Sequence, residues 1–341
     1  MKNEWHVPGS NASGTAADYP SSAAARTQWV LAHREPRGQE PSPWTPAAVF
    51  VEEELAVNGE LVGTLTVLIV SRECPWRCVY CDLWNQTLIH PTPPGAVTAQ
   101  LEQALRHPDC NSARQIKLYN AGSFFDAGAI PPNELPGLAQ RLRGFERVIV
   151  ECHPSLVGPT VLRFRDALAP AQLEVAMGLE IAHPQVLERL NKRMTLDDYA
   201  AAAALLRREG VAIRTFVMVQ PPFLPAAEAV HWAAESVAFA VKHGASVVCL
   251  IPTRPWSGPL RALAQMGYFR PPSLETLEAA WEAALAVSEG QRVFCDTWDL
   301  EQFSDCPSCF EQRALRLQRM NHTQELLPRL PVCTRCGWGG A

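Results

Sequence analysis

Short runs of apolar and β-branched residues alternate with longer helical stretches through most of this 341-residue sequence. Six of these runs are strand candidates: Thr64 to Val70, Ile116 to Tyr119, Arg147 to Val150, Leu173 to Gly178, Ala212 to Val219 and Ser246 to Ile251. Strands that alternate with helices predict a parallel sheet with right-handed crossovers. We predict an α/β fold, a six-stranded parallel (βα)6 partial TIM barrel. An open doubly wound sheet is the alternative, because periodicity does not separate the two.

The clearest helix is predicted from Leu196 to Glu209. Thr195 can cap its first turn, and Asp198 is placed to complete a capping box as a shorter stand-in for Glu. Gly210 then provides the left-handed residue at which many helices end.

The sequence divides into three segments by composition. Residues 1–45 are rich in Ala, Ser, Pro and Gly, which predicts a flexible arm with Trp29 and Trp44 as anchors. Residues 46–290 form the predicted barrel domain. Residues 291–341 form a predicted extension with a candidate terminal strand, Val293 to Trp298, and two cysteine pairs.

Composition and charge narrow the class of protein. The net charge of −5 gives no general field that attracts nucleic acid or an anionic membrane. The first residues lack the pattern of a secretory signal, and no run reaches the roughly 18 apolar residues that span a bilayer. We therefore expect a cytoplasmic protein that is not bound to a membrane. In a reducing cytosol, clustered cysteines favour metal binding or catalysis over disulfides.

The loop after the first predicted strand holds Cys74, Cys78 and Cys81 in a CxxxCxxC pattern. Three thiolates are one short of the four that hold a complete iron–sulfur cube. An iron without a protein ligand is an open coordination site, as in catalytic metal centres. A structural zinc site completed by a distant ligand, or three unrelated core cysteines, are the alternatives.

Polar or glycine residues follow the other predicted strands, where the sites of parallel barrels collect. These residues are Asn120-Ala121-Gly122-Ser123, Glu151-Cys152-His153-Pro154, Glu180, Gln220-Pro221-Pro222 and Thr253-Arg254. A carboxylate that ends an apolar strand needs a partner, which for Glu151 and Glu180 is either a ligand or an arginine such as Arg193 or Arg214. His153 is interpreted as a hydrogen-bonded loop residue rather than a proton shuttle.

Two further cysteine pairs occur near the carboxyl terminus, Cys306/Cys309 and Cys333/Cys336, with Cys295 as a spare ligand. Four thiolates close a tetrahedron, so structural zinc is the first interpretation. An auxiliary iron–sulfur cluster is the alternative.

Between the two pairs, basic residues repeat every three positions. They are Arg313, Arg316, Arg319 and His322. On a helix this spacing makes a basic stripe that is either a solvated face or a contact for phosphate or an RNA backbone.

The CxxxCxxC loop, with the aromatic Tyr80 before its last cysteine, resembles the signature of the radical S-adenosylmethionine (SAM) superfamily. The resemblance implies a [4Fe–4S] cluster on the three cysteines, SAM bound to its open iron, and an electron donor such as flavodoxin or ferredoxin. It also implies SAM contacts by residues of the loop and strand ends: Tyr80, Asn120, Gly122, Ser123, Glu151, Glu180 and Gln220. The sequence reads Ala121-Gly122-Ser123 where the family usually has Gly-Gly-Glu.

The segments GLE, NKRMT and RTFVMVQPPFL are similar to the domain shared by the elongator catalytic subunit and the methylthiotransferases. CPWRCVYCDLW, KLYNAGSFFD and VQPPFL most resemble the radical SAM proteins of archaeosine synthesis and their bacterial relatives. The resemblance covers about residues 64 to 255. Its first implication is a radical SAM enzyme that acts on a modified base of tRNA. The alternatives are a radical SAM enzyme for a small metabolite or peptide, and a zinc-stabilised binding protein without catalysis.

Overall fold

The computed structural model describes residues 18–340, and they fold around one curled sheet. Its eight strands are β1 (Ala48–Leu55), β2 (Leu61–Ile69), β3 (Ala113–Asn120), β4 (Arg147–Glu151), β5 (Gln172–Glu180), β6 (Ala212–Val219), β7 (Val247–Pro252) and β8 (Arg292–Cys295). They lie in sequence order, with β1 antiparallel to β2 and every other neighbouring pair parallel. The sheet therefore forms an open half-barrel.

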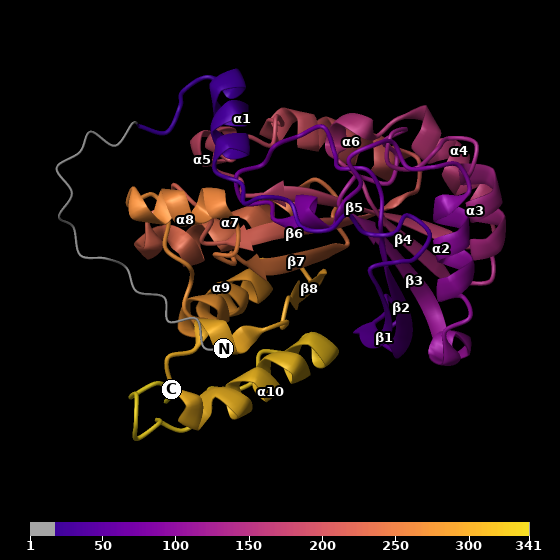
Figure 1. The fold of residues 1–341 in the computed structure, drawn as a ribbon. Coiled ribbons are helices and arrows are strands. Elements are labelled where there is room, and N and C mark those ends of the chain that lie inside the picture. Colours follow the sequence, from indigo (N-terminus) through magenta and orange to yellow (C-terminus); the bar gives the residue numbers. More distant parts are fainter. Residues whose placement is uncertain (1–17, 341) are drawn as a thin grey trace.

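Ten α-helices accompany the sheet in the described part of the chain. They are α1 (Ala23–Ala32), α2 (Ala96–Ala104), α3 (Leu135–Leu142), α4 (Pro159–Leu168), α5 (Pro184–Arg189), α6 (Leu196–Arg208), α7 (Ala229–Lys242), α8 (Gly258–Gln265), α9 (Leu274–Ala286) and α10 (Pro307–Thr323). Helices α2 to α4 lie beside β2 to β4, and α7 to α9 lie towards the other end of the curve (Figure 1). No helix among residues 18–340 combines the length and apolarity that a bilayer crossing requires.

The predicted six strands are all present, but the prediction of a six-stranded sheet is wrong. The candidate terminal strand becomes β8, and β1 was missed because Glu52 and Glu54 interrupt its apolar pattern. These carboxylates lie against basic partners from other strands. Lys117 Nζ is 2.7 Å from Glu52 and 2.6 Å from Glu54. Arg214 contacts Glu54 at 2.5 Å, so the buried carboxylate of Glu54 is paired rather than solvated.

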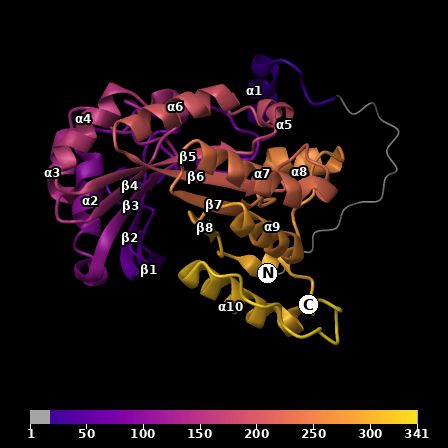
Figure 2. The same ribbon diagram turned by 180° about the vertical axis from the view of Figure 1, so that it is seen from behind.

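The predicted arm contains structure that composition does not reveal. Residues 1–17 lie outside the described residues, but α1 forms within residues 18–45. Trp29 packs on Tyr19 with ring centroids 5.0 Å apart, and the Tyr19 hydroxyl donates to the Arg189 carbonyl at 2.8 Å. Trp44 is 52% exposed and does not serve as an anchor. The segment is thus docked near α5, as Figure 2 also shows.

The basic stripe predicted on the last helix does not face solvent as a whole. Arg313 and Arg316 of α10 are buried, and each pairs with a glutamate of α9. Arg313 is 2.5 Å from Glu278, and Arg316 is 2.9 Å from Glu282. These two arginines therefore attach α10 to α9 and are not available to an RNA backbone.

Candidate functional site

The loop that follows β2 holds Cys74, Cys78 and Cys81, all partly buried. Hydrogen bonds hold the loop against the segment that follows α5. Val79 N–H donates to the Leu190 carbonyl at 3.0 Å, and Asn191 Nδ2 donates to the Arg77 carbonyl at 2.8 Å. Burial raises the pKa of Cys78 to about 12, so a bound cation is needed to hold it as a thiolate.

Glu73, directly before the first cysteine, is held by three arginines. Its carboxylate lies 2.8 Å from Arg34, 3.4 Å from Arg37 and 3.3 Å from Arg77. The guanidinium groups of Arg34 and Arg37 also lie over the ring of Trp84, 4.6 and 5.3 Å from its centroid. The segment after α1 therefore fixes the cysteine loop, a role that its composition did not indicate.

The three sulfurs of this loop are spaced differently from those near the carboxyl terminus. Among residues 18–340, only one group of three or more potential ligands lies entirely within 4.8 Å, and it is the carboxy-terminal one. The sulfurs of Cys74, Cys78 and Cys81 are thus not all this close together. A cube of four irons also holds its cysteine sulfurs wider than a single ion does, at about 6 Å, because each sulfur binds a separate iron. At least one pair of the three sulfurs is more than 4.8 Å apart, which is compatible with such a cluster.

Two strand-end carboxylates lie beside the cysteine loop. Glu180 at the end of β5 forms a buried ion pair with Lys192 at 2.6 Å. Glu151 at the end of β4 accepts from the Asn120 N–H at 3.2 Å. Burial raises the pKa of Glu151 to about 7, opposed by the Asn120 N–H and by Lys192. Burial also raises the pKa of Tyr80, whose hydroxyl lies near Glu180.

Sequence reasoning missed Lys192 and proposed the wrong arginines for these carboxylates. Arg214 pairs instead with Glu54 and with Glu174, the latter at 2.6 Å. Lys192 is electrostatically close to Cys74 and Cys78 as well as to Glu180. Its position inside the quoted NKRMT segment was the available signal.

The turn after β3 is packed against the cysteine loop. A Cβ on Gly122 would stand only 2.8 Å from Ser71 Oγ, and closer still to the Arg72 carbonyl. Glycine is therefore required here by contact with the chain itself. Asn120 Nδ2 donates to Ser71 Oγ at 3.1 Å, while Asn120 Oδ1 is a buried acceptor with no partner within residues 18–340.

His153 is a hydrogen-bonded loop residue. Its backbone N–H donates to Ser123 Oγ at 3.0 Å, and its ring Nε2 lies 3.1 Å from the Lys192 carbonyl. The imidazole ring stacks on Trp76 with ring centroids 3.7 Å apart. Burial lowers the pKa of His153 to about 3. The ring is consequently neutral near pH 7 and serves packing rather than proton transfer.

Three of the predicted cofactor-binding residues have positive φ, namely Ser123 at 64°, Glu180 at 67° and Gln220 at 55°. Each such residue costs roughly 1–3 kcal/mol, and such strain clusters at functional sites. Gln220 nevertheless differs from the other two, because its Nε2 donates to the Arg270 carbonyl at 2.7 Å. The structure therefore brings Tyr80, Glu151 and Glu180 together near the cysteines and engages Gln220 elsewhere.

The concave face of the sheet carries aromatic side chains below this group. Tyr119 of β3 and Phe216 of β6 meet edge to face at 6.0 Å and remain partly exposed. Under them lies the buried network of Lys117, Glu54 and Arg214. The aromatic pair thus lies above a buried charged network on the inner side of the sheet.

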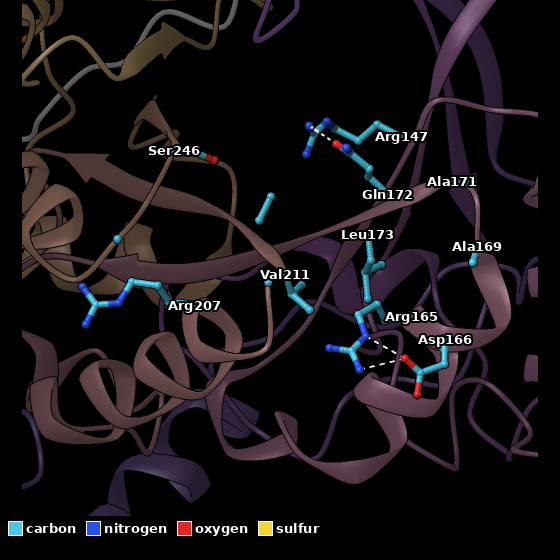
Figure 3. Close-up of a pocket in the computed structure, with 13 residues that line it drawn as sticks. Arg147, Arg165, Asp166, Ala169, Ala171, Gln172, Leu173, Arg207, Val211 and Ser246 are labelled. Atoms are coloured by element: carbon cyan, nitrogen blue, oxygen red, sulfur yellow. Dashed lines mark hydrogen bonds and ion pairs between the residues drawn. The ribbon is translucent and has the colours of Figure 1, made fainter.

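A pocket of about 590 Å³ lies at the opposite edge of the sheet. It is lined by residues at the amino ends of β4 to β7, including Arg147, Arg165, Arg207 and Ser246 (Figure 3). Arg165 is already paired with Asp166 at 2.7 Å. Because the cysteine loop follows a carboxyl end, this pocket is not part of the candidate site.

The carboxy-terminal sulfurs of Cys306, Cys309, Cys333 and Cys336 form the group within 4.8 Å. This part of the chain can bind a metal ion. Cys295 is not a member of the group, and its sulfur lies 3.8 Å from the Asp296 carbonyl.

The similarities that follow agree with the resemblance to radical SAM enzymes that the three-cysteine loop indicates. It is 28% identical to archaeosine synthase subunit beta of Methanosarcina acetivorans over 255 residues, 72% of this chain and 73% of the relative. It is 19% identical to an uncharacterised protein of Methanocaldococcus jannaschii over 305 residues, 82% of each chain. No protein-family model matches the sequence.

Among solved structures, the fold is similar to the archaeal Elp3 of Methanocaldococcus infernus, with a TM-score of 0.46 and 14% identity. The similarity covers 66% of this chain and 57% of that one.

Proposed function

We propose that Cys74, Cys78 and Cys81 hold a [4Fe–4S] cluster and that the chain binds SAM beside it. When bound, the cluster supplies the electron that cleaves SAM into methionine and a 5′-deoxyadenosyl radical, which abstracts hydrogen from the substrate. The observation that carries the proposal is the convergence of the cysteine loop, the Glu180–Lys192 pair and Glu151 at one edge of the sheet. Residues 46–290 would form the radical SAM domain and residues 291–341 the extension.

The residues around the loop have the donors and acceptors that SAM requires. The unpartnered Asn120 Oδ1 and the Glu151 carboxylate can accept from its amino group or ribose hydroxyls. Glu180, held by Lys192, places a carboxylate near Tyr80 and the cysteines. Gly122 and Ser123 form the turn after β3, which packs against the cysteine loop. A flavodoxin or ferredoxin would deliver the electron.

The first substrate that we propose is a modified base of tRNA. It is supported by the similarity to archaeosine synthase subunit beta. A planar base also suits the partly exposed Tyr119 and Phe216. The similarity to archaeosine synthase subunit beta favours an enzyme over a non-catalytic, zinc-stabilised binding protein.

A small metabolite or peptide is the second candidate substrate. The net charge of −5 and the pairing of Arg313 and Arg316 with glutamates favour it, because both reduce the surface that attracts RNA.

Anaerobic iron and sulfide analysis, with EPR of the reduced protein, tests the enzyme chemistry. We expect about four irons per chain, a spectrum that SAM perturbs, and loss of both in the Cys74→Ala, Cys78→Ala, Cys81→Ala triple variant. A wild-type protein that binds no iron after reconstitution would contradict the proposal.

The substrate is tested separately. Formation of 5′-deoxyadenosine by the reconstituted enzyme is measured with tRNA, with free nucleobases and with metabolite extract. Stimulation by tRNA, together with tRNA binding that weakens as salt rises, supports the first substrate. Stimulation by the metabolite extract alone rejects it in favour of the second.

A further inference from the structure

The four carboxy-terminal sulfurs have the spacing of ligands around a single ion. Cys306 Sγ lies 3.9 Å from Cys333 Sγ, and Cys309 Sγ lies 3.8 Å from Cys336 Sγ. These are two of the four edges that join one pair to the other, and all four sulfurs lie within 4.8 Å. A tetrahedron with Zn–S bonds of about 2.3 Å has sulfur–sulfur edges of about 3.8 Å. The arrangement therefore matches a closed tetrathiolate site.

The same spacing is too narrow for an iron–sulfur cube. In a cube each cysteine sulfur binds its own iron at one corner, which sets the sulfurs about 6 Å apart. The space between four sulfurs within 4.8 Å of one another accommodates one ion and no bridging sulfides. Because zinc favours four thiolates and takes no part in redox chemistry, a closed site of this kind is structural.

Each cysteine pair is built into a tight local turn. Cys306 is the N-cap of α10, and Cys309 lies in its first turn, where the helix dipole favours thiolate. In the turn that holds Cys333 and Cys336, the Gly337 N–H donates to the Cys333 carbonyl at 2.8 Å, and Gly337 has a φ of 76°. A bound ion would join the start of α10 to the end of the chain.

Helix α10 in turn covers the free edge of β8, the last strand of the sheet. Asn321 Oδ1 accepts from the Cys295 N–H at 2.8 Å, and Asn321 Nδ2 donates to the Cys295 carbonyl at 2.9 Å. Gln324 Oε1 accepts from the Val293 N–H at 2.6 Å. Two side-chain amides thus replace the missing neighbouring strand on an edge that would otherwise expose its peptide groups.

A second set of contacts links the metal turn to this helix. Arg313 lies 4.0 Å from the ring of Trp338, just after the last cysteine, and is 2.5 Å from Glu278 of α9. Both Trp338 and Arg313 are buried. A continuous series of contacts therefore runs from the cysteine group through Arg313 and α10 to the side-chain amides of Asn321 and Gln324 at the sheet edge.

We propose that Cys306, Cys309, Cys333 and Cys336 bind one structural Zn²⁺ ion that clamps α10 over the open edge of β8. The site does not depend on the radical SAM cluster. It is placed on the extension below α9, whereas α1 and α5, which adjoin the cysteine loop, lie at the opposite side of the molecule (Figure 1).

The first experiment is elemental and sulfide analysis of the full chain, with X-ray absorption at the zinc edge. We expect about one zinc per chain with four sulfurs at about 2.3 Å. This zinc should persist in the Cys74→Ala, Cys78→Ala, Cys81→Ala triple variant and in a Cys110→Ser control, and disappear in a Cys333→Ser, Cys336→Ser double variant. Iron and sulfide retained by the triple variant, or one iron in place of zinc, would overturn the proposal.

The clamp itself is tested by hydrogen exchange of the Val293 and Cys295 amides. In the zinc-bound protein both should be protected, and chelation of zinc should speed their exchange at least about tenfold relative to amides of β4. An Asn321→Ala variant should lose protection at Cys295 while it keeps its zinc. Unchanged exchange after zinc removal would show that the metal does not hold the edge, whether or not the double variant folds.

Discussion

The chain carries two cysteine groups that differ in number, spacing and surroundings. Near the carboxyl terminus, four sulfurs lie within 4.8 Å and leave no ligand position open. In the loop after β2, three cysteines are spaced more widely and lie beside an ion pair, Glu180 with Lys192. We propose that the carboxy-terminal group, the closed group, holds a structural ion, and that the loop group, the open group, leaves a coordination position for a reactant.

The residues that surround the two cysteine groups also differ. The carboxy-terminal group is joined to buried arginines that pair with glutamates of α9, although Glu278 Oε1 and Arg316 Nη1 have no hydrogen-bond partner within residues 18–340. The cysteine loop is surrounded by groups that are not fully satisfied, such as Asn120 Oδ1, or whose pKa is shifted, such as Glu151. The contrast lies in the carboxylates: Glu278 is paired with Arg313, whereas Glu151 has no ion pair within residues 18–340, so a ligand is expected beside Glu151.

The largest effect is expected from Arg313→Met, which tests whether the closed group is only structural. The variant removes the partner of the buried Glu278 at 2.5 Å and leaves only Arg316 at 3.9 Å, a change that costs about 3 kcal/mol. Unfolding in urea measures the loss. An Arg313→Met, Glu278→Leu double variant should recover most of it, because no unpaired charge remains.

Cleavage of SAM by the folded Arg313→Met variant should stay at the wild-type rate. If turnover falls while the free energy of unfolding does not, the closed group takes part in the reaction and the contrast between the two groups fails.

An effect on the free energy of unfolding no larger than that of Arg313→Met is expected from Glu151→Gln, which tests whether the carboxylate beside the open group is buried. Its pKa is about 7 in the folded protein and about 4.5 when unfolded, so the folded state binds the proton more tightly. Stability from this group is present below pH 4.5 and is lost as the pH rises through 7. In cluster-free protein, Glu151→Gln should gain about 3 kcal/mol relative to wild type between pH 4.5 and pH 8.

Urea unfolding at several pH values measures this gain, since other groups that titrate cancel in the difference between the two proteins. A control, Glu235→Gln, changes an exposed carboxylate and should follow the wild type at every pH. A Glu151→Gln profile parallel to that of the wild type would mean that the carboxylate is solvated.

Local features were predicted well from the sequence. The capping box of α6 is present as expected, with Thr195 accepting from Asp198 N–H and Asp198 bonded back to Thr195 N–H. The six apolar runs are strands because each is long enough to bury a β-branched face. The cysteine pairs near the carboxyl terminus meet, as their spacing indicated. The capping box and the strands depend on residues only a few positions apart, and the metal group depends on two short CxxC motifs 27 positions apart.

Features that depend on distant partners were not predicted. Glu54 lies within a strand because Arg214, 160 residues away, pairs with it. The helix α1 forms in a segment of loop-like composition because Tyr19 and Trp29 dock near α5. Lys192 was passed over as a partner for Glu180, since charge alone does not choose among several basic residues.

Lys192→Met tests whether the ion pair positions Glu180 for the ligand of the open group. We expect SAM to bind about tenfold more weakly, about 1.4 kcal/mol, because Glu180 loses its partner at 2.6 Å and no longer holds its orientation. Equilibrium binding to the reconstituted protein measures this. A Lys192→Met, Glu180→Gln double variant should bind no more weakly than Glu180→Gln alone. Full SAM affinity in Lys192→Met would leave the pair with a structural role only.

The smallest effect is expected from Arg37→Ala, which measures how strongly the segment after α1 fixes the open group. Arg37 is one of three arginines on Glu73 and the most distant of them at 3.4 Å, so Arg34 and Arg77 retain the carboxylate when it is removed. We expect a loss of about 0.5–1 kcal/mol in urea unfolding. Arg34→Ala, whose side chain is 9% exposed and 2.8 Å from Glu73, should cost about twice as much as an exposed pair. Equal losses would mean that Arg37 acts mainly through its other contacts, the Thr87 carbonyl at 2.6 Å and the ring of Trp84, rather than through Glu73.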